Sequence, residues 1–257
     1  MKAVLLAGGL GTRLREETEY RPKPMVEVGG RPIIWHIMKG FAHHGISDFV
    51  VCTGYRSEVI KDFFLNYEGR THDFTVRLGQ PAEVTYHSAH DESGWQVTVA
   101  DTGQTTMTGG RVKRIQDHIG DERFMVTYGD GLADVDIPAL LDFHESHGRL
   151  ATVTTIRPLS RFGVMDMTEE GAVEQFREKP LTDGYVNGGF FVFEPGVFDY
   201  LDDECVLEQA PLEALAKDGQ LMAFRHEGFW QPMDTYREFT MLNEMWDRDE
   251  APWKVWG

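Results

Sequence analysis

The sequence is poor in cysteine and in long apolar runs, and both shortages exclude classes of protein. The two cysteines, Cys52 and Cys205, are far apart and form no CxxC pair, so neither a zinc site nor a disulfide framework is predicted. We expect two buried thiols in a reducing compartment. The apolar run at residues 1–9 is too short for a membrane span or for the core of a signal peptide, which predicts a cytoplasmic protein.

Positive charge is also scarce. The chain has 25 Lys and Arg residues against 42 Asp and Glu residues, a net charge of −17 over 257 residues. Nucleic acids and anionic membranes are held by an excess of Lys and Arg, so we expect neither as a partner. Any phosphate site must therefore be local.

What is present is the composition of a globular domain. A hydrophobic fraction of 41% and a charged fraction of 26% are typical of such proteins. The chain is long enough to bury a sizeable core. Because no linker, repeat or low-complexity tract divides it, we predict a single domain over residues 1–257.

Short apolar runs alternate with stretches of helical period. The runs are bounded by Gly or Asp, as is typical of buried parallel strands, and lie at 2–7, 48–54, 124–131 and 150–156. Helical patterns at 31–45 and 135–148 each reach a glycine. This alternation predicts an α/β fold with a doubly wound, mostly parallel sheet. From about residue 157 the pattern changes to shorter strand-like pieces, followed by helical segments near 211–218 and 234–247.

The first predicted strand runs into a glycine-rich segment, GGLGTR at residues 8–13. It is not a Walker A loop, because the chain contains no Gly-Lys pair, and not a dinucleotide fingerprint, because Leu14 stands at the third glycine position. Such a turn lets backbone N–H groups approach an anion, and Arg13 and Lys23 add positive charge, which suits a triphosphate. The alternative is a strand–turn whose glycines only supply positive φ angles.

Two aspartates are candidate metal ligands. Asp130 stands in GDG at the end of a predicted strand, where small neighbours leave room for an ion, although this pattern is also typical of a turn. Asp234 precedes the last helical pattern, and the alternative there is an N-cap. We expect His144 and His147, three residues apart, on a partly exposed helix face, in a solvated or core role and not at a metal.

Several motifs together carry a family resemblance. GGLGTR followed by the Lys of PKP resembles the signature of the sugar-phosphate nucleotidyltransferases, which make nucleotide sugars from a nucleoside triphosphate and a sugar 1-phosphate. The resemblance covers essentially the whole chain and is closest to the cytidylyl-transferring branch, through KPMVEVGGRPIIWHIMK, GYRSEVIKDFF, DTGQTTMTGGRVKR, TYGDGLADVD, NGGFFVF, GFWQPMDT and APWKVW. It implies a Rossmann-like fold in which residues 1–156 bind the nucleotide and residues 157–257 form a sugar-phosphate-binding half over the strand ends.

The resemblance also implies a reaction. A sugar phosphate oxygen attacks the α-phosphorus of a triphosphate and expels pyrophosphate, with Mg²⁺ and fixed cations stabilising the charge and no enzyme nucleophile. The implied substrates are CTP and glucose 1-phosphate, the implied product is CDP-glucose, and the implied assembly is a homo-oligomer. Two alternatives stay open: a dTTP- or UTP-dependent transferase, and a non-catalytic module that binds nucleotide sugars.

The resemblance assigns roles to individual residues. Arg13 and Lys23 are catalytic, and Asp130 and Asp234 hold the metal. The nucleotide contacts are Leu6, Ala7, Gly8, Gly9, Leu10, Gly11, Thr12, Arg13, Lys23, Thr105, Gly110, Arg111 and Gly129. The sugar-phosphate contacts are Gly163, Glu178, Lys179, Asn187 and Gly188. From the residues alone, a solvated lysine at 179 and a simple turn at 187–189 are the alternatives.

Selectivity for cytosine requires acceptors near its amino group and donors for O2 and N3. The backbone carbonyls of Leu6 to Gly8 are candidate acceptors. Arg111 is a candidate donor, with Thr105 and Gly110 as further contacts. The alternative for this stretch is a flexible surface loop with a solvated, basic helix start.

Overall fold

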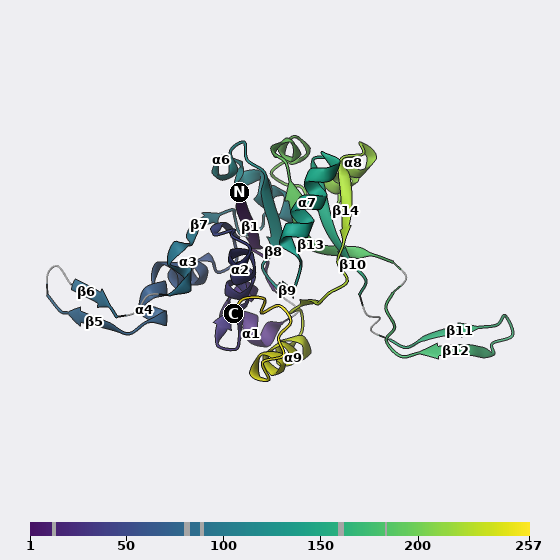
Figure 1. The fold of residues 1–257 in the computed structure, drawn as a ribbon, viewed down its shortest axis with the longest axis horizontal. Coiled ribbons are helices and arrows are strands. Elements are labelled where there is room, and N and C mark those ends of the chain that lie inside the picture. Colours follow the sequence, from purple (N-terminus) through teal and green to yellow (C-terminus); the bar gives the residue numbers. More distant parts are fainter. Residues whose placement is uncertain (12–13, 80–82, 88–89, 159–161, 183) are drawn as a thin grey trace.

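A central sheet organises the molecule. The structure, a computed structural model, describes residues 1–11, 14–79, 83–87, 90–158, 162–182 and 184–257 (Figure 1). Seven of the described strands form one sheet in the order β14-β10-β13-β8-β1-β4-β7. Strand β13 is antiparallel to both neighbours and all other pairs are parallel. The strands are β1 (Lys2–Ala7), β4 (Asp48–Thr53), β7 (Gln96–Asp101), β8 (Phe124–Tyr128), β10 (Ala151–Ile156), β13 (Val186–Phe193) and β14 (Leu221–Arg225). The mostly parallel sheet and its four predicted strands are confirmed.

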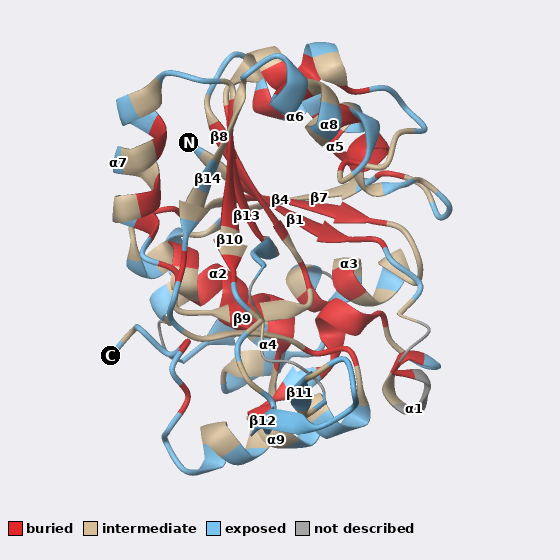
Figure 2. Ribbon diagram, turned by 90° about the vertical axis from the view of Figure 1, so that its right-hand side faces the viewer, coloured by how far each residue is buried: buried red, intermediate tan, exposed pale blue. Residues whose placement is uncertain are grey.

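Helices cover both faces of this sheet, which is why its central strands are apolar on both sides (Figure 2). Ala3, Leu5 and Ala7 of β1 face one core, and Val4 and Leu6 face the other. The first core is covered by α2 (Ile33–His43), α3 (Ser57–Leu65), α7 (Ile137–His147) and α9 (Tyr236–Asp247). The second is covered by α5 (Thr108–Arg114), α6 (Gln116–Ile119), the 3₁₀ helix η3 (Pro195–Tyr200) and α8 (Ala210–Lys217).

The helical patterns in the sequence correspond to α2, α7, α8 and α9. The predicted stop of α7 is confirmed, because Gly148 follows it with φ 61° in the left-handed conformation. His144 is buried, and its Nδ1 lies 2.8 Å from Thr152 Oγ1. His147 Nε2 contacts the same hydroxyl at 2.8 Å. Of the two roles expected for this pair, solvated or core, His144 therefore has the core role, and His147 is half-buried.

Two hairpins project from this body (Figure 1). One consists of β5 (Phe74–Arg77) and β6 (Glu83–Tyr86), and the other of β11 (Val164–Met167) and β12 (Val173–Arg177). All residues of these four strands are exposed. The strand-like pieces expected after residue 157 are confirmed as strands, but the second hairpin extends away from the sheet and does not lie over the strand ends.

Short elements connect the larger ones. They are α1 (Arg15–Thr18), η1 (Lys23–Met25), β2 (Glu27–Val28), β3 (Arg31–Pro32), α4 (Tyr67–Thr71), η2 (Asp91–Gly94), β9 (Gly131–Ala133) and β15 (Trp230–Pro232). No helix in the described ranges is both long and apolar enough to cross a membrane.

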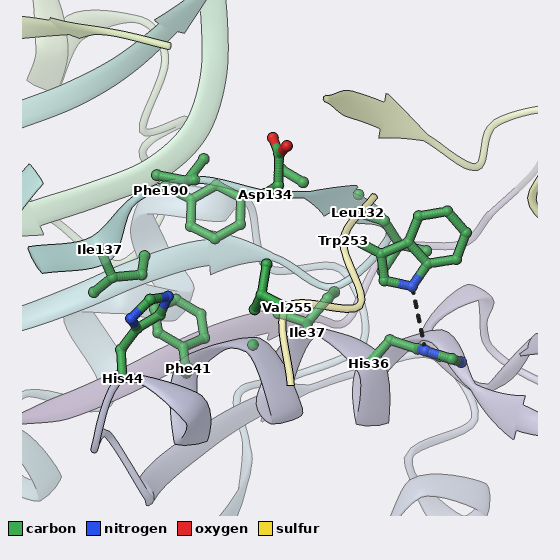
Figure 3. Close-up of a pocket in the computed structure, with 14 residues that line it drawn as sticks. His36, Ile37, Phe41, His44, Leu132, Asp134, Ile137, Phe190, Trp253 and Val255 are labelled. Carbon is green, nitrogen blue, oxygen red and sulfur yellow. Dashed lines mark hydrogen bonds between the residues drawn. The ribbon is translucent and has the colours of Figure 1, made fainter. Parts of the chain in front are cut away.

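The carboxyl-terminal segment packs on α2. Trp253 is buried, and its indole N–H donates to Nδ1 of His36 at 3.4 Å beside a cavity of about 20 Å³ (Figure 3). The Trp246 and Trp253 rings stack at 6.5 Å, and Trp256 meets Trp35 edge-on at 5.9 Å. These tryptophans therefore pack within the chain.

The two cysteines lie in different environments. Cys52 is buried in β4, and burial raises the pKa of its thiol to about 12. Cys205 is only half-buried, so the expectation of two buried thiols is wrong for this residue.

Candidate active site

Lys23 joins three segments that are far apart in the sequence. Its ammonium donates to Asp130 Oδ2 at 2.7 Å and also to Asp234 Oδ1. Lys23 begins η1, Asp130 follows β8, and Asp234 lies between β15 and α9. Lys23 and Asp234 are both buried, so charge and hydrogen bonding hold this cluster together in a poorly solvated place.

The chain before α9 delivers Asp234 to this cluster. The alternative prediction, Asp234 as the helix N-cap, is wrong, because Thr235 is the cap and accepts from the Glu238 N–H. Glu238 closes a capping box and also accepts from the Asp234 N–H at 2.7 Å. The Met233 N–H donates to the Asp130 carbonyl at 2.9 Å, which holds the two aspartate segments together. The Asp234 carboxylate is thus directed at Lys23.

The donor set of Asp130 and Asp234 fits a hard divalent cation. Mg²⁺ is commonly held by one or two carboxylates, with substrate phosphates and water completing its ligands. The described residues include no group of three or more His, Cys, Asp or Glu side chains arranged around a metal. A cation here would therefore depend on substrate oxygens, and within the chain Lys23 donates to both carboxylates.

Arg111 is buried beneath the glycine turn. Its Nη1 donates to the carbonyls of Thr53 and Gly103 at 2.9 and 2.8 Å and to Thr102 Oγ1 at 2.8 Å. Its Nη2 donates to the Gly8 carbonyl at 3.0 Å. Burial lowers the pKa of this guanidinium. The alternative of a solvated, basic helix start is therefore wrong for Arg111.

Gly8 is required by this contact. A Cβ at Gly8 would lie 2.0 Å from Arg111 Nη1, whereas one at Gly9 would meet no atom within 4 Å. Gly9 and Leu10 are exposed, and Gly11 has a φ of 62° that favours glycine. The predicted residues Thr12 and Arg13 lie outside the described residues.

Of the carbonyls proposed for cytosine, those of Leu6 and Gly8 already accept hydrogen bonds within the chain. Leu6 accepts from the Gly129 N–H at 3.0 Å, and Gly8 accepts from the Tyr55 N–H as well as from Arg111. Ala7 pairs with Thr53 at the end of β1. The start of the glycine turn is thus fixed by backbone contacts.

Of the remaining predicted base contacts, Thr105 is exposed and Gly110 is buried. The Gly110 N–H donates to the Cys205 carbonyl at 3.0 Å. A Cβ at Gly110 would lie 2.3 Å from the Asp203 carbonyl oxygen. Gly110 therefore packs against the turn at 203–205, and its predicted contact with the nucleotide stays a prediction.

A cavity of about 240 Å³ opens beside the two aspartates. Of the predicted sugar contacts, Gly188 lines it, and its carbonyl accepts from the Trp230 indole at 2.7 Å. Asn187 precedes Gly188 and donates to the Tyr128 hydroxyl at 2.9 Å. The lining residues are Thr127, Tyr128, Asp130, Gly131, Gly188, Phe190, Trp230, Pro232 and Asp234.

The other predicted sugar contacts lie at the base of the second hairpin. Glu178 and Lys179 are exposed, with Lys179 Nζ 3.9 Å from Glu178 Oε1. Gly163 packs against Phe176 and Glu178, since a Cβ there would lie 2.6 Å from the Phe176 ring and 3.1 Å from Glu178 Oε2. None of these three residues lines the cavity in the described part of the chain.

Sequence reasoning missed two aromatic walls of the cavity, Tyr128 and Trp230. Both residues belong to the sequence motifs TYGDG and GFWQPMDT, but a motif does not show which of its residues face a cavity. Glu208, which bonds the Tyr128 hydroxyl, lies 80 residues from it and has no local signal.

Comparison with known proteins agrees with this geometry. The model of the nucleotidyl transferase family matches residues 2–233. The chain is 51% identical to glucose-1-phosphate cytidylyltransferase of Salmonella typhi, with both chains covered completely. It is 44% identical to the probable glucose-1-phosphate cytidylyltransferase of Bacillus subtilis, again over 100% of both chains.

Solved structures support the fold. A UDP-glucose pyrophosphorylase complexed with UDP-glucose superimposes with a TM-score of 0.69 at 17% identity, covering 96% of this chain and 98% of the other. The chain therefore belongs to the nucleotidyl transferase family, and within it to the glucose-1-phosphate cytidylyltransferases.

Proposed function

We propose that this enzyme transfers the cytidylyl group of CTP to α-D-glucose 1-phosphate, giving CDP-glucose and pyrophosphate. The observation that carries the proposal is the Lys23 ammonium between Asp130 and Asp234 at the edge of the cavity. A triphosphate and a sugar phosphate are both anions, so their reaction needs fixed positive charge and metal-binding carboxylates close together. The names of the relatives supply the base and the sugar.

The reaction is a direct displacement. A phosphate oxygen of glucose 1-phosphate forms a bond to the α-phosphorus of CTP while the bond to the pyrophosphate oxygen breaks. Lys23, buried beside the glycine turn, stabilises charge on the phosphates. Holding both reactants in line lowers the barrier by about 7–11 kcal/mol in well-oriented systems. No covalent enzyme intermediate is needed.

Enzymes of this family generally use a divalent metal ion, and we propose Mg²⁺. Asp130 and Asp234 are the residues that would hold it. Such an ion supplies a Lewis acid for the phosphate oxygens. The predicted roles of Arg13 on the phosphates and of Gly163, Glu178 and Lys179 on the sugar phosphate belong to the same proposal.

The test is pyrophosphate release with glucose 1-phosphate and Mg²⁺, offering CTP, UTP, dTTP, ATP and GTP separately. Turnover with CTP well above that with the others is the expected result. A preference for dTTP or UTP would keep the transferase and overturn the cytidylyl assignment. Failure with every nucleotide would favour a different sugar phosphate or a non-catalytic binding module.

We also propose that the enzyme forms a homo-oligomer and acts in the cytoplasm. The apolar face of the second hairpin supports the first part, because Met165, Met167 and Phe176 are each more than half exposed, at 52%, 61% and 58%. Exposed apolar patches commonly mark interfaces between proteins. The single-domain prediction for residues 1–257 fits the one central sheet.

A further inference from the structure

One wall of the cavity holds a hydroxyl that the proposed reaction does not use. Tyr128 ends β8, two residues before Asp130, and its side chain lines the cavity. Its hydroxyl donates to Glu208 Oε1 at 2.5 Å and accepts from Asn187 Nδ2 at 2.9 Å. The Tyr128 ring needs space beside Gly189, where a Cβ would lie 3.0 Å from ring atom Cδ2.

Glu208 is held from its other side. Thr108 Oγ1 donates to Glu208 Oε2 at 2.6 Å and accepts from the Leu207 N–H at 2.9 Å. Both carboxylate oxygens therefore bind a hydroxyl. Thr108 begins α5, the helix that carries Arg111, so the tyrosine is anchored to the element beneath the glycine turn.

This anchor fixes the amide of Asn187. Asn187 Oδ1 accepts from the Gly189 N–H at 2.8 Å, while Nδ2 donates to Tyr128. The amide cannot rotate by 180° without losing both bonds. Its second N–H has no hydrogen-bond partner among the residues that the structure describes, which leaves one oriented donor beside Gly188.

We propose that Tyr128, held by Glu208, is a positioning residue that orients the Asn187 amide toward an oxygen of the sugar phosphate. The inference rests on the proposed function and extends it to two residues to which neither the family resemblance nor the relatives' names assign a role. An oriented donor recognises a hydroxyl or phosphate oxygen of the sugar phosphate and leaves nucleotide binding untouched.

The test is Tyr128→Phe, which removes the hydroxyl and keeps the ring. We expect the KM for glucose 1-phosphate to rise about tenfold, as for the loss of one oriented hydrogen bond, with the KM for CTP within about twofold of wild type. Tyr200→Phe is the matched control, because the Tyr200 hydroxyl donates to the Asp218 carboxylate at 3.0 Å away from the cavity. It should change neither KM.

The conservative variant tests the anchor. Glu208→Gln keeps an acceptor for the tyrosine and should behave like wild type, while Glu208→Ala should reproduce Tyr128→Phe. An unchanged KM for glucose 1-phosphate in Tyr128→Phe, or an equal rise of both KM values, would overturn the inference. If wild type makes no CDP-glucose, the proposed function fails, and calorimetric binding of glucose 1-phosphate to wild type and Tyr128→Phe still decides the inference: weaker binding by the variant supports it, and equal or absent binding overturns it.

Discussion

At the scale of single residues, the site is a balance of charge around Lys23. The Lys23 ammonium donates to both carboxylates, and removing it takes that stabilising partner from each of them. Lys23 also packs against the glycine turn, because a Cβ at Gly11 would lie 3.4 Å from Lys23 Cβ. One residue thus connects the nucleotide loop to both aspartates.

Lys23→Met should lower the free energy of unfolding by about 1–3 kcal/mol, because Asp130 and Asp234 then repel each other. Adding Mg²⁺ should raise the melting temperature of this variant more than that of wild type, since a divalent cation replaces the missing charge. Lys254→Met, which removes an exposed ion pair with Asp249, is the control and should cost less than about 1 kcal/mol. A variant that is as stable as wild type and insensitive to Mg²⁺ would contradict the prediction that Lys23 offsets the repulsion between Asp130 and Asp234.

His36 makes stability depend on pH. Burial lowers its pKa from 6.5 to about 4, and its neutral ring bonds the Val28 carbonyl and the Trp253 indole (Figure 3). As the pH falls, the unfolded chain takes up the proton near 6.5 while the folded chain resists until about 4. Stability is therefore complete above pH 6.5 and is lost below it, by about 3 kcal/mol at pH 4.

Urea unfolding of wild type and His36→Gln at pH 7 and pH 5 measures this contribution. The variant should lose less stability between the two pH values than wild type does. His43→Gln, an exposed residue of the same helix, should follow wild type. Parallel losses in wild type and His36→Gln would exclude His36 as the source.

At the scale of elements, the glycine turn and α5 form one unit. Arg111 of α5 donates to the carbonyls of Gly8, Thr53 and Gly103, which lie in three separate segments, so the turn after β1 rests on a buried guanidinium. At the start of the last helix, α9, the capping box at Thr235 sets the position of Asp234. The start of α9 thus places Asp234, a candidate metal ligand.

Gly8→Ala should disrupt the first unit. Its methyl group would overlap the Arg111 guanidinium, and we expect a loss of about 2–4 kcal/mol in unfolding free energy, with a raised KM for CTP. Gly9→Ala is the control, because a methyl group at that position would meet no atom within 4 Å and stability should change by less than about 0.5 kcal/mol. Equal melting temperatures for the two variants would refute the packing argument.

Thr235→Ala should cost about 1 kcal/mol, the usual cost of removing an N-cap side chain. Thr240→Ala in the exposed part of the same helix serves as comparison and should be nearly neutral, because Thr240 bonds only a carbonyl of its own helix. Chemical denaturation of both variants measures the difference. If both variants prove equally stable, the cap does not fix the start of α9.

At the scale of the whole molecule, charge and shape separate two kinds of contact. The net charge is −17, so we expect phosphates to be bound by a few locally placed cations, Lys23 among them. The two hairpins project away from the body (Figure 1), and their strands carry exposed apolar side chains. We therefore expect substrate binding and the proposed subunit contact to use different surfaces of the molecule.

The predicted homo-oligomer can be measured by size-exclusion chromatography with light scattering. Met165→Glu places a charge on the apolar face of the second hairpin and should shift the mass toward that of one chain. Gln175→Glu is the control, since Gln175 pairs with Asp166 on the other face. A wild-type mass equal to that of a single chain would contradict the proposed homo-oligomer.

Much of the sheet could be predicted because strands buried on both faces are apolar throughout, as in 2–7 and 124–131. Helices α2 and α7 could be predicted from the helical period of their apolar residues and from the glycine that comes after each helix. The strands of the second hairpin could be predicted, but the sheet that they join could not, because alternation of apolar and polar residues shows only that a segment is extended. Whether His144 is solvated or part of the core could not be predicted, because its Thr152 partner lies on another element.

The sequence by itself determined the fold class, the family and the positions of the glycine turn and the two aspartates, because these depend on local pattern and on motifs. Only the tertiary structure decided that Lys23 lies between Asp130 and Asp234, that Arg111 is buried under Gly8, and that Tyr128 and Glu208 hold Asn187. Each of these contacts joins residues at least 59 positions apart. Local propensity carries no information on such pairs, which packing around the sheet alone brings together.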